Sequence, residues 1–416
     1  MKQQRNSWRK NIYMLAVCNS FTASSYTMIV PFLPLYLLEL GADESEVTIY
    51  SGFVYAVTFL IAAIMAPVWG KMADAHGKKV MGMRAIVMLA VTYLFGGFVT
   101  SPEGLFVMRI IQGFASGFMP MAMTMGSCFS PQKEIGYGLG IIHSGLTVGT
   151  VIGPLIGGLV SYWVGMKNSF YVAGGALVFL AFLYWFVLDE PPTAEEKALR
   201  DGELRPAPAP IKGSAGERKT SIITDIVYAF GNRRLVVILF LIFSSNLVNN
   251  ILQPMLALHI GSLLGSKENV SLISGFIFGM GGLSGALMVA NWGKFGQRKG
   301  FLRTLSYAFC GAGIFTVAQF FARDVYVFGA LQFFFGQFFI GTNPTTGALL
   351  AKTAPANFQG RAFGLSSTFY QLGGVVGPVL AGFIAAAVGV APLFIITGGI
   401  LLALAAIVWK YREKEQ

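Results

Sequence analysis

Two ionisable side chains lie inside apolar stretches of the sequence, where a charge or a proton is unusual. Arg109 is followed by Gln112, nearly one turn later if the stretch is helical. His143 lies in a second apolar stretch, and histidine's reference pKa of about 6.5 lets it change charge in the physiological range. Removing a guanidinium from water costs free energy unless it is paired, so an arginine in an apolar stretch suggests a partner or a function. Arg109 and His143 are therefore the first candidates for proton or ion chemistry.

Carboxylates are absent from the middle of every apolar stretch. The 19 acidic residues lie in polar segments or near the ends of apolar ones, with Glu39 and Asp225 closest to an apolar centre. The sequence also has no His/Asp/Glu cluster, no metal-ligand spacing, no Ser–His pair and no Walker motif. We therefore expect that the protein is not an enzyme and that it binds no metal or cofactor.

Composition and the spacing of charges indicate which elements must position these residues. Hydrophobic residues make up 55% of the 416 residues, and charged residues make up only 12%, about half the fraction of a soluble domain. A membrane-crossing helix needs about 20 apolar residues. The last long apolar stretch is interrupted by Gly389 and Pro392 and predicts two helices. The sequence therefore predicts an all-α polytopic membrane protein with twelve transmembrane helices, from charge-free stretches at 11–38, 47–70, 85–102, 110–132, 135–166, 168–188, 235–266, 269–293, 304–322, 325–351 and 362–409.

Basic residues are distributed unevenly between the two sides of these predicted helices. Of the 30 Lys and Arg residues, only Lys167, Lys267 and Arg323 fall in loops on the side opposite the N-terminus. This bias predicts that both termini are cytoplasmic and that the protein is a multi-pass protein of the cell membrane. It also explains the net charge of +11 without a nucleic-acid partner.

An internal repeat divides the chain into two halves. Ser51-Gly52-Phe53 recurs as Ser274-Gly275-Phe276, and Gly153-Pro154 recurs as Gly377-Pro378 at a spacing that is longer by a single position. Six crossings return the chain to its starting side, so the halves must be parallel repeats. We expect a six-helix bundle over residues 1–189, a cytoplasmic linker rich in Pro, Ala, Glu and Lys over 190–220, and a second six-helix bundle over 221–416.

Three sequence signatures resemble those of the major facilitator superfamily. The segment 70–79 between the second and third helices is similar to that superfamily's loop pattern G-x-x-x-D-x-x-G-[RK]-[RK], on Gly70, Asp74, Gly77, Lys78 and Lys79. Arg109 with Gln112-Gly113 resembles its second signature. The third, which marks exporters and antiporters in the superfamily, is matched in the fifth helix by Gly145, Gly149, Gly153, Pro154, Gly157 and Gly158.

The resemblance covers the whole chain and is closest to the twelve-helix drug:proton antiporters, including bacterial multidrug efflux pumps. It implies the major facilitator fold, and it implies that the 70–79 loop acts as a conformational latch. It also implies coupling to protons, for which Arg109 and His143 are the candidates in this sequence. The glycines from Gly145 to Gly157 recur every four residues, and such a small-residue stripe allows two helices to approach closely. The expected partners are protons, a small-molecule substrate and the lipid bilayer, and we expect a monomer.

A substrate cavity is expected between the halves near the membrane midplane. In the superfamily, helices 1, 4, 7 and 10 with parts of others line this cavity. The polar and flexible residues of these helices are the candidate lining: Asn19, Tyr26, Gln112, Met119, Asn246, Asn249, Asn250, Gln253, Gln337, Asn343, Tyr370 and Gln371.

Two functions remain open for the sequence. The first is proton-driven efflux of amphipathic drugs and dyes. The second is export of one metabolite, such as a siderophore-type metal chelator or a sugar. The buried Arg109 and the absence of an intramembrane carboxylate suit an anionic or zwitterionic substrate, which keeps the second function open beside the first.

Overall fold

The structure is a computed structural model, and it is helical throughout its regular elements. It describes residues 2–192, 228–265, 269–355 and 358–413, without the side chains of 2–7, 74, 133, 359, 360, 412 and 413. No strand occurs in these ranges. Most of the predicted linker lies outside them.

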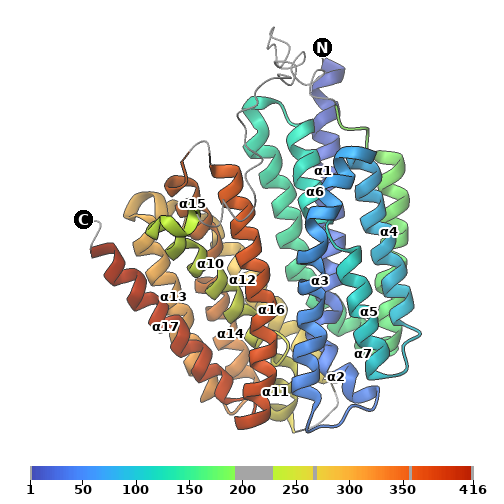
Figure 1. The fold of residues 1–416 in the computed structure, drawn as a ribbon. Helices are drawn as coiled ribbons and strands as arrows, with labels where there is room; N and C mark the ends of the chain where they lie inside the picture. Colours follow the sequence, from blue (N-terminus) through green and yellow to red (C-terminus); the bar gives the residue numbers. More distant parts are fainter. Residues whose placement is uncertain (1, 193–227, 266–268, 356–357, 414–416) are drawn as a thin grey trace.

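The first half of the chain forms the bundle on the right of Figure 1, which contains α1 to α7. Its elements are α1 (Lys2–Ile29), η1 (Val30–Phe32), α2 (Leu33–Glu39), α3 (Val47–His76), α4 (Lys78–Gly96), α5 (Pro102–Ala115), α6 (Phe118–Phe129), η2 (Gln132–Glu134) and α7 (Ile135–Val187).

The second half forms a similar bundle beside it. Its elements are α10 (Arg233–Leu252), α11 (Leu256–Leu264), α12 (Val270–Lys299), α13 (Phe301–Phe320), α14 (Val325–Phe339), α15 (Thr342–Thr353), α16 (Gln359–Val388) and α17 (Pro392–Glu413).

The prediction of twelve crossings is confirmed when α7 is counted as two. Eleven helical segments of the described chain are long and apolar enough to cross a membrane. One of them is α7, whose 53 residues would extend about 80 Å if straight, against a bilayer core of about 30 Å. Non-helical backbone at Gly165 (φ 82°, ψ 162°) divides it into two crossings. The second half has its break at the equivalent Gly389, between α16 and α17.

Four of the crossings are interrupted part-way. Pro31 and Pro34 accompany the break between α1 and α2, and Pro254 accompanies that between α10 and α11. Proline has no N–H for the helix ladder and clashes with the preceding turn. The chain also breaks at Gly117, which has φ 111°, between α5 and α6, and at Gly341 between α14 and α15. These breaks recur at the repeat spacing, so each half interrupts its first and fourth crossing.

Helix starts are repeated as well. The side chain of Ser101 accepts a hydrogen bond from the N–H of Gly104 at the start of α5. Asp324, its equivalent in the second half, accepts from the N–H groups of Tyr326 and Val327 at the start of α14. Such N-caps satisfy backbone donors that the first helical turn leaves free.

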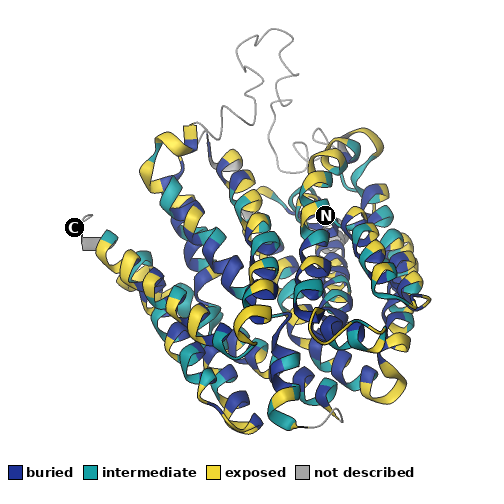
Figure 2. Cartoon of the chain, turned by 60° about the horizontal axis from the view of Figure 1, so that its bottom comes forward, coloured by how far each residue is buried: buried dark blue, intermediate teal, exposed yellow. Residues whose placement is uncertain are grey.

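Each bundle has its own apolar core. One cluster of buried apolar residues runs from Trp8 to Leu188 and includes Ala257 from the second half, and another runs from Ala229 to Val408. Figure 2 shows buried positions where helices meet and exposed positions on the outward faces. Large apolar side chains are among the exposed residues, with Trp163 74% and Phe186 79% exposed. Such a surface suits lipid rather than water, so the protein is a multi-pass membrane protein.

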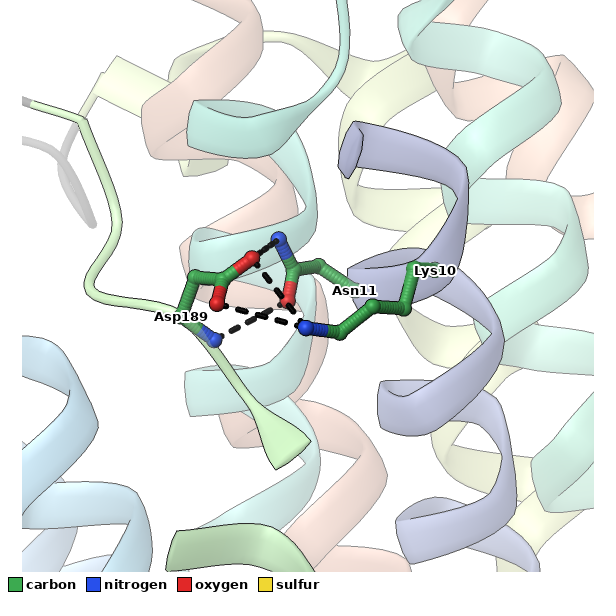
Figure 3. A network of polar contacts seen from close by, with 3 residues as sticks. All are labelled: Lys10, Asn11 and Asp189. Carbon is green, nitrogen blue, oxygen red and sulfur yellow. Dashed lines mark hydrogen bonds and ion pairs between the residues drawn. The ribbon is translucent and has the colours of Figure 1, made fainter. Parts of the chain in front are cut away.

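The N-terminal helix is connected to the end of the first bundle by polar contacts. The Asn11 side chain donates to the Asp189 carboxylate at 3.0 Å and accepts from the Asp189 N–H at 3.0 Å. The Lys10 ammonium lies 3.3 Å from the same carboxylate (Figure 3). The contacts hold the start of the chain against the residue that precedes the linker.

Candidate functional site

A cavity of 530 Å³ lies along one face of α3. Its α3 residues recur three or four positions apart from Phe59 to Ala73, a distance of about 20 Å along the helix. One end lies at Tyr26 and Phe59, within the bundle. The other end lies at Gly70 and Lys78, on the side of the molecule that carries the termini (the terminal side). The lining is Tyr26, Thr58, Phe59, Ala62, Ala66, Trp69, Gly70, Ala73, Lys78, Ser116, Gly117, Pro120, Met121, Thr124 and Gln371.

On the side opposite the terminal side, the two bundles meet at glycines, where the neighbouring backbone leaves no room for a side chain. A methyl group added at Gly52 in α3 would overlap the carbonyl oxygen of Pro378 in α16. A methyl group at Gly275 in α12 would lie 2.5 Å from the carbonyl oxygen of Pro154 in α7. These two contacts are equivalent in the repeat. Figure 1 shows the bundles in contact at this end and farther apart on the terminal side.

The glycine pattern of α7 serves two different interfaces. Gly145, Gly149 and Gly157 lie directly against backbone carbonyls of α1, and Gly153 lies against Thr27 and Ser24 of α1. Gly158 instead faces the other half: a methyl carbon added there would lie 2.7 Å from the carbonyl oxygen of Ser271. The stripe therefore holds α7 against α1, and its Gly158 and Pro154 hold the two halves together.

Arg109 is buried beside the deep end of the cavity, with 1% of its surface exposed. Its Nε donates to the carbonyl oxygen of Val54 at 3.3 Å, and its Nη1 donates to the Gln112 side-chain oxygen. The rings of Tyr26 and Tyr55 lie 5.6 and 5.9 Å from its guanidinium carbon. Within the described residues its Nη2 has no hydrogen-bond partner. The site is thus a buried cation between aromatic faces, with one donor group unused.

A second arginine supports the break in the fourth crossing. Arg84 of α4 donates from Nη2 to the Ser116 carbonyl at 3.1 Å and from Nη1 to the Phe114 carbonyl at 3.5 Å. Its guanidinium lies 3.7 Å from the centre of the Trp69 ring. The break leaves carbonyl groups without helical donors, and Arg84 supplies them. Sequence reasoning did not select Arg84, because an arginine near a helix end is also an ordinary feature of a membrane surface.

The 70–79 loop lies at the terminal-side end of the cavity. Gly70 and Lys78 line it, and Gly77 (φ 91°) forms the turn between α3 and α4. The Lys79 ammonium lies 5.2 Å from the centre of the Trp185 ring. The side chain of Asp74 lies outside the described residues, so the latch remains a prediction.

His143 is exposed in this structure. It lies in α7, four residues before Thr147 and eight before Val151, along one side of the helix. Val151 lies against Gly282 of α12, and Figure 1 shows the two bundles farther apart on the terminal side. His143 therefore lies on the face of α7 that the second half would cover if the terminal side closed.

The predicted cavity residues fall into several environments. Tyr26 and Gln371 line the cavity. Gln112 binds Arg109, and Gln253 accepts a hydrogen bond of 2.9 Å from Tyr55, which connects the two halves.

The other candidates do not line this cavity. Asn19 donates to the Ile142 carbonyl, and Asn246 donates to the Tyr370 carbonyl, so both connect neighbouring helices. Asn250 donates to Asn246 one turn away. The Gln337 carbonyl accepts from the Trp292 indole at 2.6 Å. The remaining candidates outside the cavity lining are Met119, Asn249 and Asn343.

Several site residues were missed by sequence reasoning. The wall formed by Phe59 and Trp69 was missed because apolar residues are indistinguishable from lipid-facing ones in a sequence. Gly52 and Gly275 were used only to define the repeat. Their recurrence was a usable signal, because a repeated glycine in an apolar helix often marks close packing.

Comparisons with known proteins identify the class of protein. The family model described as Major Facilitator Superfamily matches residues 15–345 and 292–416. The chain belongs to this superfamily of transporters, as its sequence signatures predicted.

Several curated relatives match nearly the whole chain. An uncharacterized MFS-type transporter, YuxJ, of Bacillus subtilis is 31% identical and covers 94% of this chain and 96% of its own. The multidrug resistance protein MdtG of Proteus mirabilis is 29% identical, with 96% and 95% covered. A homologue of the multi-drug resistance efflux pump PmrA in Lactococcus lactis is also 29% identical, with 97% and 95% covered.

Solved structures share the fold at low identity. A bacterial homologue of the human lysosomal transporter Spinster has a TM-score of 0.77 at 14% identity, with 97% and 96% of the two chains covered. The nucleoside transporter NupG has a TM-score of 0.74 at 17% identity, with 96% and 98% covered. These likenesses confirm the predicted major facilitator fold.

Proposed function

We propose that this transporter exports amphipathic small organic molecules from the cell by proton antiport, through alternating access. The observation that carries the proposal is the cavity, which runs from Tyr26 and Phe59 to the terminal side, while glycine contacts join the halves on the opposite side. A substrate that entered from the terminal side would meet mainly aromatic and aliphatic walls. Relatives named as multidrug resistance proteins support the same class of substrate.

The orientation follows from charge. Most basic residues lie on the terminal side, which the positive-inside bias assigns to the cytoplasm. In this orientation the cavity would open towards the cytoplasm, which supports an inward-open state of an exporter in the cell membrane. We propose that it acts as a monomer, because the single chain contains both halves and the complete cavity.

Proton coupling is assigned to His143 and Arg109. His143 is exposed here and lies on a face that the second half would cover in the outward-open state. Burial disfavours the charged form of a histidine. Release of its proton to the cytoplasm would therefore accompany closure of that side. The buried positive charge of Arg109 would repel other protons from the deep end of the cavity.

The test uses everted membrane vesicles that contain the full-length protein, with an imposed pH gradient. Ethidium and an anionic dye are supplied in separate assays, so that the charge of the probe does not decide the result. We expect gradient-dependent uptake of at least one dye, abolished by a protonophore. Vesicles without the protein provide the control, and failure of folded protein to move either dye would overturn the proposal.

A second candidate function is export of one anionic or zwitterionic metabolite, such as a metal chelator. The observation that favours it is Arg109, which is buried with no carboxylate partner in the described residues. Uptake of chelators with no uptake of unrelated dyes would support this second function over multidrug export.

A further inference from the structure

Two buried N–H donor groups near the deep end of the cavity make no hydrogen bond of ordinary length in the described chain, and only the Tyr26 and Tyr93 hydroxyls interact weakly with them. They are the Nη2 group of Arg109 and the Nε2 group of Gln112. The bond from Arg109 Nη1 to the oxygen of Gln112 fixes the amide orientation, so its nitrogen is the atom left free. Unsatisfied buried donors are costly, and they suit a ligand that brings oxygen acceptors.

Among the described residues, the charge of Arg109 also has no carboxylate within ion-pair distance. The sequence contains no Asp or Glu between residues 47 and 73 or between 75 and 102, the stretches that supply its neighbours from α3 and α4. Residues 11–38 and 104–133 are also free of Asp and Glu. Asp74 belongs to the opposite end of α3, about 20 Å from Phe59. A buried cation without a partner is destabilising, so a bound anion would relieve this cost.

The site is separated from the cavity by a single layer of side chains. Tyr26 contacts Arg109 on one side and lines the cavity on the other. Thr58 also lines the cavity, and its hydroxyl donates to the Arg109 carbonyl at 3.0 Å. The Tyr26 hydroxyl is buried and makes no hydrogen bond of ordinary length in the described chain, so rotation of this ring would give up only its weaker interactions with Arg109 and Tyr55.

We propose that the deep end of the cavity binds the carboxylate or sulfonate head group of an amphiphilic substrate, through Arg109, Gln112 and a rotated Tyr26. The apolar body of the substrate then lies along Phe59 and Met121. The transporter therefore selects anionic over cationic amphiphiles. This inference rests on the proposed export function and specifies its substrate class.

The test compares two probes that share one dansyl body and one five-carbon chain. One ends in a carboxylate, dansyl-aminohexanoate, and the other ends in an ammonium, dansylcadaverine. Binding to the full-length protein in lipid nanodiscs is measured by equilibrium dialysis. We expect the carboxylate to bind about tenfold more tightly, the effect of one charge-assisted hydrogen-bonded contact.

Variants test whether Arg109 causes the preference. Arg109→Gln should reduce the tenfold ratio to about one, and Arg109→Lys, which keeps the charge but loses the fork of donors, should retain only part of it. Arg303→Gln, which removes one positive charge from α13 in the second half, should leave the ratio unchanged. Gln112→Leu is a milder variant that should lower the ratio about threefold. It tests the same site if Arg109→Gln does not fold.

Each outcome decides the proposal. Equal or tighter binding of the ammonium probe would overturn the anion preference and leave the export function intact, provided that the vesicles take up either dye. A preference unchanged in Arg109→Gln would overturn the site. Complete displacement of the carboxylate probe by excess chloride would show that an inorganic anion occupies the site and would overturn the substrate assignment. If neither probe bound and no dye were transported, the export function would fall as well.

Discussion

The two halves of the molecule carry different chemistry at equivalent positions. Arg109 in α5 corresponds to Gln332 in α14 at the spacing of the repeat. Gln332 accepts a hydrogen bond of 2.6 Å from Gln319 of α13, so the second half has a neutral amide pair where the first has a cation. The duplicated scaffold therefore keeps its helix positions, while the charge is confined to one half.

The breaks in the fourth crossing of each half differ in the same way. In the second half the Trp292 indole donates to the Gln337 carbonyl near the break at Gly341. In the first half the equivalent Trp69 has a buried indole nitrogen with no partner in the described chain, and Arg84 supplies the donors instead. The glycine contacts at Gly52 and Gly275, by contrast, are the same in both halves.

The largest effect is expected where the halves are alike. Gly52→Leu and Gly275→Leu should each abolish most dye uptake, because the new side chain meets a backbone carbonyl that cannot move alone. Uptake by vesicles with matched protein amounts is the measurement. Gly364→Leu in α16, where an added carbon has no neighbour within 4 Å, is the control. A large loss in only one of the two variants would contradict their equivalence.

The next effect is expected where the halves differ in charge. Arg109→Gln makes the first half resemble the second, and it should lower transport of an anionic substrate about tenfold. It should also raise the thermal midpoint of unfolding, because it removes a buried charge without a counter-ion, worth about 1–3 kcal/mol. Gln332→Leu should change anion transport less than twofold. A lower midpoint in Arg109→Gln would show that packing of the guanidinium outweighs its desolvation.

A smaller effect is expected at His143, whose equivalent in the second half is Ser367. His143→Gln should reduce transport about threefold and flatten its dependence on pH. Initial rates at a constant pH difference, over a range of absolute pH, provide the measurement. Ser367→Ala should keep the original pH dependence. An unchanged profile in His143→Gln would exclude this residue from proton coupling.

The smallest effects are expected at the helix breaks. Arg84→Met removes the donors to two carbonyls and should cost about 2 kcal/mol of stability, whereas Trp292→Phe removes one donor and should cost about 1 kcal/mol. Both are measured as shifts in the thermal midpoint of the purified protein. Trp69→Phe removes an indole N–H that makes no hydrogen bond within the described chain, so it should cost less than Trp292→Phe. If Trp69→Phe cost more stability than Trp292→Phe, the hydrogen bonds described here would not be the ones that stabilise the two breaks.

The sequence by itself determined the twelve crossings, the duplicated halves and the absence of a carboxylate from their centres. These properties follow from the order of residues along the chain, because the length of an apolar stretch and the position of a charge need no knowledge of neighbours. It also located Arg109 beside Gln112, because a helix places residues three apart on one face.

Only the tertiary structure decided which residues share a site. It showed that Tyr26 and Gln371 line the cavity while Asn19 and Asn246 connect neighbouring helices. It also showed that Gly158 lies against the opposite half, although the glycines next to it in the stripe lie against α1. The physical reason is that a helix has several faces, and each face is covered by a segment that lies far away along the chain.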